Sequence, residues 1–212
     1  MKTANNEIKS IIKTYNDIKV LINKKIGQFS KISSQMDKRK IRRELFFCLL
    51  TPQSKAESCW ECVKNIEGVM KNDCQFEKLV PLLKKVRFNR TKAKRLIEAR
   101  KNIDSVVKIL KTKTDAKRKR DWLVKNIKGL GMKEATHFLR NIGLSENLAI
   151  LDRHILRKMA NLGIINKIPN SMSKKKYIEI ERKLQEFSKK IGIPVADLDF
   201  VFWYQETGRI FK

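Results

Sequence analysis

The sequence predicts an all-α protein, and three observations in its 212 residues support this fold class. Apolar residues recur at helical spacing in almost every segment. No alternation of apolar and polar residues is long enough to indicate a useful strand. Only 8 glycines and 4 prolines interrupt the chain, which favours helices joined by short loops. No repeat of roughly 20–50 residues is visible, so a solenoid is not expected.

The predicted helices follow one another along the whole chain. In the first, apolar residues follow the i, i+3, i+4, i+7 rule at Ile8, Ile11, Ile12, Tyr15, Ile18, Ile22 and Ile26. The second contains Ile41, Leu45, Cys48 and Leu49. It ends at Thr51-Pro52, because proline disfavours helix in the residue before it. Further helices are predicted over about 53–67, 75–86, 89–101, 115–127, 131–142, 153–162, 173–191 and 194–206.

The charge of the chain predicts an anionic partner. There are 49 Lys and Arg against 22 Asp and Glu, a formal net charge of +27. This far exceeds the roughly 2–8 charges that serve solubility, so nucleic acid is the favoured partner class. The alternative is a chain from a lineage rich in lysine. The densest charge cluster, Lys111 to Trp122, either faces DNA or is a solvated loop leading into a helix near Asp115.

The sequence shows no targeting or membrane segment. MKTANNEIKS at the N-terminus lacks an apolar region of the secretory type. The longest compact apolar run, Leu45 to Leu50, is too short to span a bilayer. We therefore expect a soluble cytoplasmic protein, associated with the nucleoid of a prokaryote, that has no contact with membrane.

The four cysteines predict neither a metal site nor an iron–sulfur cluster. Cys59 and Cys62 have the spacing that begins a zinc site, but the second close pair of ligands is absent. Residues three apart share one face of a helix. Buried free thiols are therefore the favoured interpretation for Cys48, Cys59, Cys62 and Cys74.

Two glycines between predicted helices form a candidate phosphate-binding hairpin. Gly129 and Gly131 flank Leu130, and glycine permits positive φ and close approach of another molecule. The free N–H groups and the dipole at the start of the next helix would favour a DNA phosphate. A glycine turn with no binding role is an equally good interpretation.

Lys133 and Asp152 are the candidate catalytic pair. A lysine in the first helical turn has the wrong sign for the helix dipole, so it is either tolerated or used. A neutral amine is a nucleophile. Asp152 has the position of an N-cap, but a carboxylate near such an amine also stabilises the cation that forms when a base–sugar bond breaks. His154 and Arg157 follow at the same helix start, either as phosphate contacts or as ordinary packed and exposed residues.

These residues resemble a known family. Gly129-Leu130-Gly131-Met132-Lys133, followed by Leu151-Asp152-Arg153-His154, is similar to the helix–hairpin–helix and Gly/Pro…Asp signature of base-excision DNA glycosylases. The proline of that signature is absent here, since Lys128 precedes the first glycine. The lysine and the aspartate are typical of the bifunctional glycosylase/lyase branch. Three further segments resemble the archaeal-type, second subfamily of 8-oxoguanine DNA glycosylases: Leu50 to Trp60, Val86 to Leu96 and Leu198 to Lys212.

The resemblance assigns roles to four more residues. Gln53 would fill the space left by an extruded base, and Phe88 and Trp203 would sandwich that base. Lys212 would help distinguish 8-oxoguanine from guanine, with a backbone carbonyl or the terminal carboxylate accepting the N7–H. From the residues alone, a core Phe88 and an exposed Gln53 are the favoured interpretations.

The reaction that the resemblance implies needs no metal or cofactor. Lys133 would displace the base through a Schiff base, Asp152 would stabilise the transition state, and β-elimination would nick double-stranded DNA that contains 8-oxoguanine. The protein is expected to act as a monomer. The alternatives are a glycosylase for oxidised pyrimidines and a non-catalytic DNA-binding module.

The resemblance also implies an architecture. Residues 1–212 would form a single glycosylase unit with two helical lobes around a DNA-binding cleft. A central lobe is expected over about 53–140, and a second lobe is expected from about 1–52 and 141–212. The cleft between them would hold Lys133 and Asp152.

Overall fold

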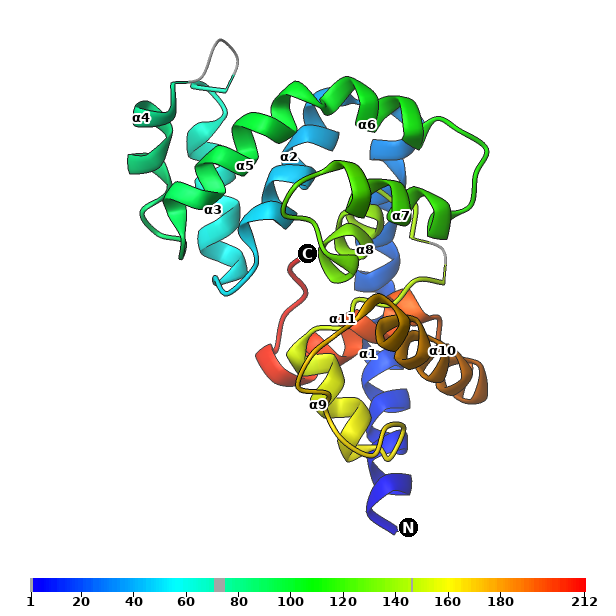
Figure 1. The fold of residues 1–212 in the computed structure, drawn as a ribbon. Coiled ribbons are helices and arrows are strands. Elements are labelled where there is room, and N and C mark those ends of the chain that lie inside the picture. The colour runs from blue at the N-terminus through cyan, green and yellow to red at the C-terminus, as the bar shows by residue number, and fades with distance from the viewer. Residues whose placement is uncertain (1, 71–74, 146) are drawn as a thin grey trace.

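The computed structural model describes residues 2–70, 75–145 and 147–212, and over these ranges every regular element is a helix (Figure 1). The all-α prediction is therefore confirmed for the part of the chain that the structure describes. The elements in chain order are α1 (Lys2–Gln35), α2 (Lys38–Leu50), α3 (Ala56–Ile66), α4 (Phe76–Leu79), the 3-10 segment η1 (Val80–Leu83), α5 (Asn89–Lys101), α6 (Ile103–Leu110), α7 (Ala116–Asn126), α8 (Met132–Asn141), α9 (Arg153–Asn161), α10 (Lys174–Ile191) and α11 (Val195–Thr207).

Two elements differ from the sequence prediction. Helix α6 was not predicted, although its buried residues Ile103, Val106 and Leu110 have helical spacing. The predicted helix over 75–86 is instead one turn of α-helix, α4, followed by η1, whose first turn contains Pro81. Proline has no N–H to continue the α-helical hydrogen bonds, so the chain tightens there.

Polar caps define where several helices begin. Asp115 accepts a hydrogen bond from the Arg118 N–H at 2.7 Å and starts α7. Ser173 accepts one from the Lys176 N–H at 3.2 Å and starts α10. Such caps satisfy N–H groups that have no partner within the helix. For the charged run Lys111 to Trp122, the interpretation as a loop leading into a helix is confirmed, because the run enters α7 through the Asp115 cap.

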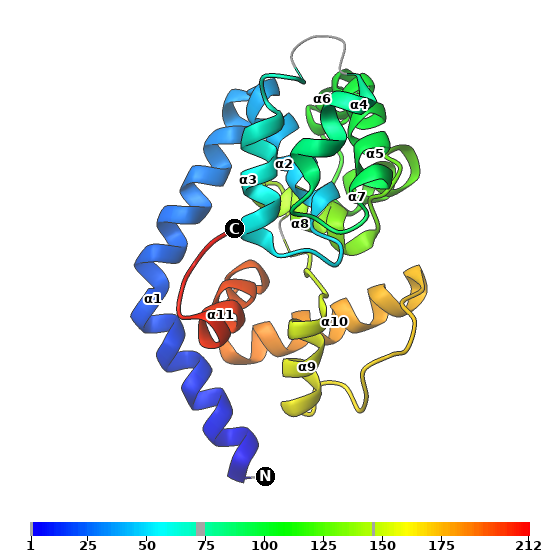
Figure 2. The same cartoon turned by 90° about the vertical axis from the view of Figure 1, so that its left-hand side faces the viewer.

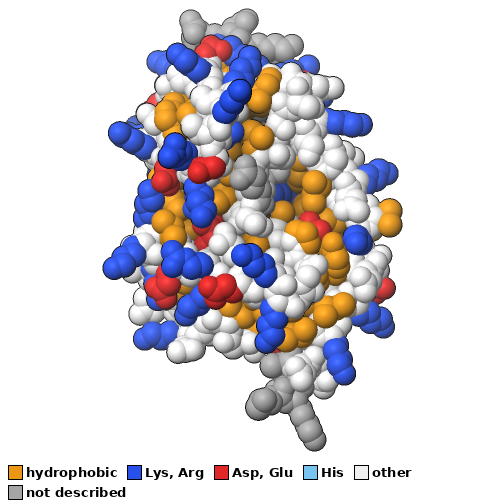
Figure 3. Space-filling view, turned by 90° about the vertical axis from the view of Figure 1, so that its right-hand side faces the viewer, with side chains coloured by type: hydrophobic (Ala, Val, Ile, Leu, Met, Phe, Trp, Pro, Cys, Tyr) orange, Lys and Arg blue, Asp and Glu red, His pale blue; other side chains and the backbone are white. Residues whose placement is uncertain are grey.

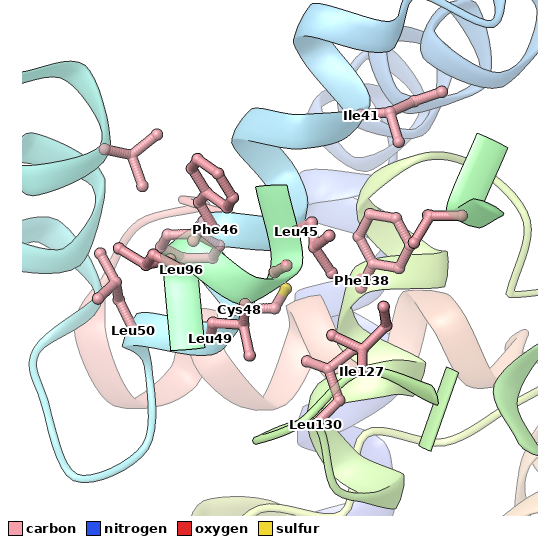
Figure 4. Packing of buried hydrophobic residues seen from close by; sticks show 14 of the residues in the cluster. Ile41, Leu45, Phe46, Cys48, Leu49, Leu50, Leu96, Ile127, Leu130 and Phe138 are labelled. Carbon is pink, nitrogen blue, oxygen red and sulfur yellow. The ribbon is translucent and has the colours of Figure 1, made fainter. Parts of the chain in front are cut away.

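The buried apolar side chains form two cores. The first runs from Ile32 to Leu148 and is built around α2, whose residues pack against α5 and α8 (Figure 4). The second combines the α1 residues from Ile11 to Phe29 with residues of the chain from Ala149 to Phe202. Helix α1 runs alongside both cores (Figure 2).

This packing differs from the lobe boundary expected at residue 53. Helix α2 belongs to the first core, since its whole apolar face, from Ile41 to Leu50, packs there. The chain passes to the second core between Leu148 and Ala149. Beyond α11 the chain returns to the first core, against which Phe211 packs (Figures 1 and 2).

Two ion pairs, one buried and one partly buried, join elements of the two cores. Arg120 of α7 donates two hydrogen bonds to Glu181 of α10, at 2.6 and 2.9 Å. Arg140 of α8 donates to Asp199 of α11 at 2.9 Å. Each pair therefore links a helix of the first core directly to a helix of the second.

The remaining sequence expectations concern cysteines and membranes. Cys48, Cys59 and Cys62 are buried free thiols, as predicted, and Cys74 lies outside the described residues. Among the described residues there is no group of three or more His, Cys, Asp or Glu that could hold a metal ion. None of the helices that the structure describes is both long and apolar enough to cross a bilayer.

Candidate active site

The glycine hairpin has the geometry of an anion site. Gly129 has a φ of 97°, and a Cβ there would lie 2.5 Å from the side chain of Arg95. Gly131 is the N-cap of α8 and supplies no side chain to the first helical turn. The N–H groups at the start of α8 are therefore free to bind a phosphate oxygen, which the helix dipole also favours.

Lys133 lies in that first turn. Its side chain is 24% exposed, and its Nζ is 3.4 Å from Glu134 Oε1. Its ion pair among the described residues is thus with its chain neighbour and not with Asp152. The lysine borders two adjoining cavities, which brings its amine within reach of a molecule bound in either.

Asp152 serves as the N-cap of α9, as predicted. Its Oδ1 accepts hydrogen bonds from the N–H groups of His154 at 2.8 Å and Ile155 at 2.9 Å. Its Oδ2 has no hydrogen bond to another described residue. Asp152 borders the same two cavities as Lys133. One oxygen is therefore committed to the helix, and the other is available to a bound molecule.

The two cavities meet at the predicted site residues. One has a volume of about 640 Å³ and the other about 790 Å³. Both are lined by Thr51, Gln53, Lys133, Asp152 and His154. The smaller cavity also reaches Trp203 and Lys212, while the larger extends along Gly131 and α9. Residues far apart in sequence thus come together around one continuous space.

Three predicted residues line neither cavity: Gly129, Phe88 and Arg157. Phe88 directly precedes α5, is 56% exposed, and has a left-handed backbone with φ of 57°. Arg157 is exposed on α9. The prediction of a core Phe88 from the residues alone was wrong, since a large aromatic side chain is here held out in solvent.

Gln53 has an unusual backbone. The Ser54 N–H donates to the Thr51 carbonyl at 3.0 Å, which closes a four-residue turn with Pro52 and Gln53 in the middle. Gln53 has a φ of 54°, a conformation that favours glycine or asparagine at this turn position. The left-handed conformation costs a residue with a Cβ roughly 1–2 kcal/mol. Strain of this kind is common at functional sites.

Trp203 and His154 form one wall of the smaller cavity. Their rings meet edge to face with centroids 5.7 Å apart. The His154 Nδ1 lies 2.6 Å from Glu206 Oε2, so His154 is held toward α11. This contact leaves Trp203 at the border of the cavity, where an aromatic ring can stack on a planar ligand.

Lys212 directs its ammonium into the first lobe. The Nζ donates to Glu44 and lies 3.5 Å from the ring centre of Trp60. Burial lowers the pKa of Lys212, and the Glu44 carboxylate counteracts this. The side chain of Lys212 is thus occupied within the first lobe, and the residue also lines the smaller cavity.

Sequence reasoning missed several residues of the smaller cavity, among them His137, Arg140 and Asp199. Burial lowers the pKa of His137 well below its ordinary value, so its imidazole is neutral. Burial raises the pKa of Asp199 to about 6 against the effect of Arg140, and the negative charge of Asp152 adds to the rise. His137 and Arg140 follow Lys133 at helical spacing, which is a signal the sequence contained.

Cations as well as carboxylates line the two cavities. Arg87 and Arg153 line the larger cavity, and Lys55 and Arg209 line the smaller one. On another face of the molecule, lysine and arginine side chains are spread over the surface rather than gathered in one patch (Figure 3). A polyanion is thus attracted to the molecule generally and meets further cations at the cavities.

Comparison with known proteins shows similarity to 8-oxoguanine DNA glycosylases along nearly the whole chain. The family model described as 8-oxoguanine DNA glycosylase matches residues 22–193. An 8-oxoguanine DNA glycosylase/AP lyase of Fusobacterium nucleatum is 39% identical to this chain, covering 98% of it and 99% of that protein.

Two solved structures are also similar. The crystal structure of the 8-oxoguanine DNA glycosylase of Thermotoga maritima matches with a TM-score of 0.90 and 32% identity, covering 99% of this chain and 100% of that one. The Methanocaldococcus jannaschii 8-oxoguanine glycosylase/lyase, in complex with a 15mer DNA containing 8-oxoguanine, matches with a TM-score of 0.88 and 35% identity. That match covers 97% of this chain and 99% of the other.

Proposed function

Because the chain belongs to the 8-oxoguanine DNA glycosylase family, we propose that it excises 8-oxoguanine from double-stranded DNA and cleaves the strand at the resulting abasic site. The observation that carries this proposal is the position of Lys133 and Asp152 on the same two adjoining cavities, beside a hairpin with free N–H groups. An amine, a carboxylate and a phosphate grip are the groups that this chemistry requires.

Binding begins with phosphates and ends with a base outside the helix. The free N–H groups at the start of α8, from Gly131 to Lys133, bind one phosphate, and exposed cations, Arg157 among them, bind others. His154, which lines the larger cavity, contacts the same DNA backbone in this proposal. A base within a duplex is out of reach, so the lesion must be extruded. Gln53 takes the vacated space, and its strained backbone is consistent with that role.

The extruded base enters the smaller cavity. Trp203 stacks on one face of the base there, and the exposed ring of Phe88 covers the other once DNA is bound. 8-Oxoguanine carries an N7–H donor that guanine lacks. The main chain of Lys212 supplies an acceptor for it, and an unpaired buried donor would cost about 1–3 kcal/mol.

Lys133 carries out the chemistry. Its neutral amine attacks C1′, the C1′–N9 bond breaks, and the base leaves with its electron pair and takes up a proton. The free oxygen of Asp152 stabilises the cationic sugar. One nitrogen proton is then transferred to O4′ as the C1′–O4′ bond breaks, and the opened sugar is left as a protonated Schiff base on Lys133. Removal of a C2′ proton then expels the 3′ phosphate and nicks the strand. The enzyme acts as a monomer on nucleoid DNA in the cytoplasm.

Borohydride trapping tests this proposal. A duplex with one 8-oxoguanine should give a covalent adduct with the wild type and none with Lys133→Gln. Lys128→Gln, which removes a charge from the same hairpin, should still give the adduct. Adduct only on a duplex with an oxidised pyrimidine would reject the substrate and keep the mechanism. DNA binding without any adduct would indicate a non-catalytic binding module.

A further inference from the structure

Two strained residues lie on neighbouring loops at the site. Gln53 and Phe88 have left-handed backbones, with φ of 54° and 57°, although neither is glycine. Met36, at the turn between α1 and α2, is the other non-glycine residue with positive φ among those the structure describes. Such conformations persist only where surrounding contacts enforce them. The groups that hold these two loops therefore influence how Gln53 and Phe88 meet DNA.

One buried ammonium holds the Gln53 turn. Lys92 of α5 is 1% exposed. Its Nζ donates to the carbonyls of Leu50 at 2.6 Å and Pro52 at 2.8 Å, and to the Ser54 hydroxyl at 2.9 Å. An ammonium has three donors, and all three are used within residues 50–54. The turn that contains Gln53 is thus fixed to α5 on both of its sides.

The same lysine is tied to the Phe88 loop. The Lys92 N–H donates to the Phe88 carbonyl at 2.9 Å in the first turn of α5. The Ser54 hydroxyl, which accepts from Lys92, also accepts from the Arg87 N–H at 3.0 Å. Lys92 and Ser54 therefore connect the backbone on both sides of Phe88 to the turn that contains Gln53.

Stability alone does not account for a charge at this position. The three acceptors of the Lys92 ammonium are neutral, and the cations of Arg87 and Arg95 lie close enough to oppose its charge. Burial lowers the pKa of Lys92. Burying an ammonium without a counter-ion is unfavourable, so a neutral packed residue would serve the core better. What the ammonium provides is three directed hydrogen bonds to one turn.

We propose that Lys92 is a positioning residue that keeps Gln53 and Phe88 in a fixed relation, so that filling the vacated space and stacking on the extruded base occur together. This inference rests on the roles proposed above for those two residues. Lys92 then acts on lesion extrusion and base capture. It has no part in the reaction of Lys133 at a site that has already lost its base.

Lys92→Met tests this inference, because methionine has a similar length and no charge. Two rates are compared in the full-length protein: excision of 8-oxoguanine from a duplex, and strand cleavage at an abasic site placed in the same duplex. We expect excision to fall on the order of 10²-fold, as small misplacements of binding groups do. Abasic-site cleavage should stay at the wild-type rate. An equal loss of both activities would show a merely structural role and overturn the proposal.

A control variant and a second test variant complete the experiment, and the second also tests the proposal if Lys92→Met folds poorly. Lys119→Met removes another buried lysine of the first lobe that borders neither cavity, and it should leave both rates unchanged. Ser54→Ala removes the hydroxyl shared by Lys92 and Arg87 but leaves the carbonyl contacts of Lys92 in place. It should lower excision selectively and more weakly than Lys92→Met. Wild-type excision by a folded Ser54→Ala would overturn the proposal.

A double-mutant cycle separates this inference from the function on which it rests. Lys92→Met should have little further effect in a background that carries both Gln53→Ala and Phe88→Ala, since it acts through those two residues, and additive losses would refute it. Wild-type excision by both Phe88→Ala and Gln53→Ala would instead refute the proposed roles of those residues. Selective loss in these two variants, with normal excision by Lys92→Met, would refute only the role of Lys92.

Discussion

Arg120→Met should destabilise the protein strongly, because it breaks an ion pair buried between the lobes. The Arg120 and Glu181 side chains are each 2% exposed. Two parallel hydrogen bonds of 2.6 and 2.9 Å join them, and the Arg120 Nη1 also donates to the Thr136 hydroxyl at 3.2 Å. The guanidinium lies 5.5 Å from the ring centre of Tyr177.

The expected loss in the free energy of unfolding follows from the buried Glu181 carboxylate that Arg120→Met leaves without its partner. After Arg120→Met, the Glu181 carboxylate stays buried with the Ala149 N–H, 2.9 Å away, as its remaining donor. Removing one partner of a buried pair costs about 3–5 kcal/mol. Arg120→Met combined with Glu181→Gln removes both charges and keeps an acceptor for Ala149. The double variant should therefore recover most of the lost free energy of unfolding.

Denaturant unfolding measures these differences, followed both by far-UV circular dichroism and by tryptophan fluorescence. The two probes must give coincident transitions, because two lobes need not unfold together. The matched control is Lys174→Met, which breaks an exposed pair with Asp121 at 2.9 Å between the same two helices. That variant should change the free energy of unfolding by less than about 1 kcal/mol. A loss by Arg120→Met no larger than that of the control would refute the reasoning.

Three other predictions concern the site. Asp152→Ala should lose excision, and loss of the N-cap should cost about 1 kcal/mol of stability. Asp152→Asn should lose excision alone, because asparagine caps a helix equally well. Excision assays and denaturant unfolding of both variants check this. The pKa of Asp199 is raised from 3.8 to about 6 in the native state. In the pH window between these two values, the native state therefore binds more protons than the unfolded state. The contribution of Asp199 to stability therefore falls as pH rises through the window, and thermal melts should show this dependence lost in Asp199→Asn. Gln53→Gly should relieve roughly 1–2 kcal/mol of left-handed strain, partly offset by the entropy of glycine, and should raise the melting temperature while it slows excision from duplex DNA.

The helices were largely predictable because each buries one apolar stripe. The expected helix over 89–101 coincides with α5, and the ends of α8 and α9 lie within one residue of expectation. Helix α6 was not predicted, because it is only eight residues long and a single residue separates it from α5. The assignment of α2 to the first core was not predicted, because periodicity shows that a face of a helix is buried but does not show which core buries it.

The positions of Lys133 and Asp152, the proposed catalytic pair, were also predictable, because both residues stand at helix starts that the sequence marks. The neighbours of the pair were predictable only in part. His137 and Arg140 lie on the Lys133 face of α8, so helical spacing contained that information. Helical spacing did not predict that Asp199 lies at the site, because the contact of Asp199 with Arg140 depends on how α11 of the second lobe packs against α8.

Gln53 and Phe88 mark the limit of sequence reasoning at this site. By composition and spacing one reads as an exposed polar residue and the other as a core aromatic residue. The left-handed backbone that distinguishes them comes from contacts made elsewhere, chiefly by Lys92 and Ser54. A glycine would adopt either conformation without strain, so the presence of side chains there indicates that the side chains themselves are needed. The same reasoning explains why a buried lysine is retained in the first core: a neutral residue would pack as well, but it would not hold both loops.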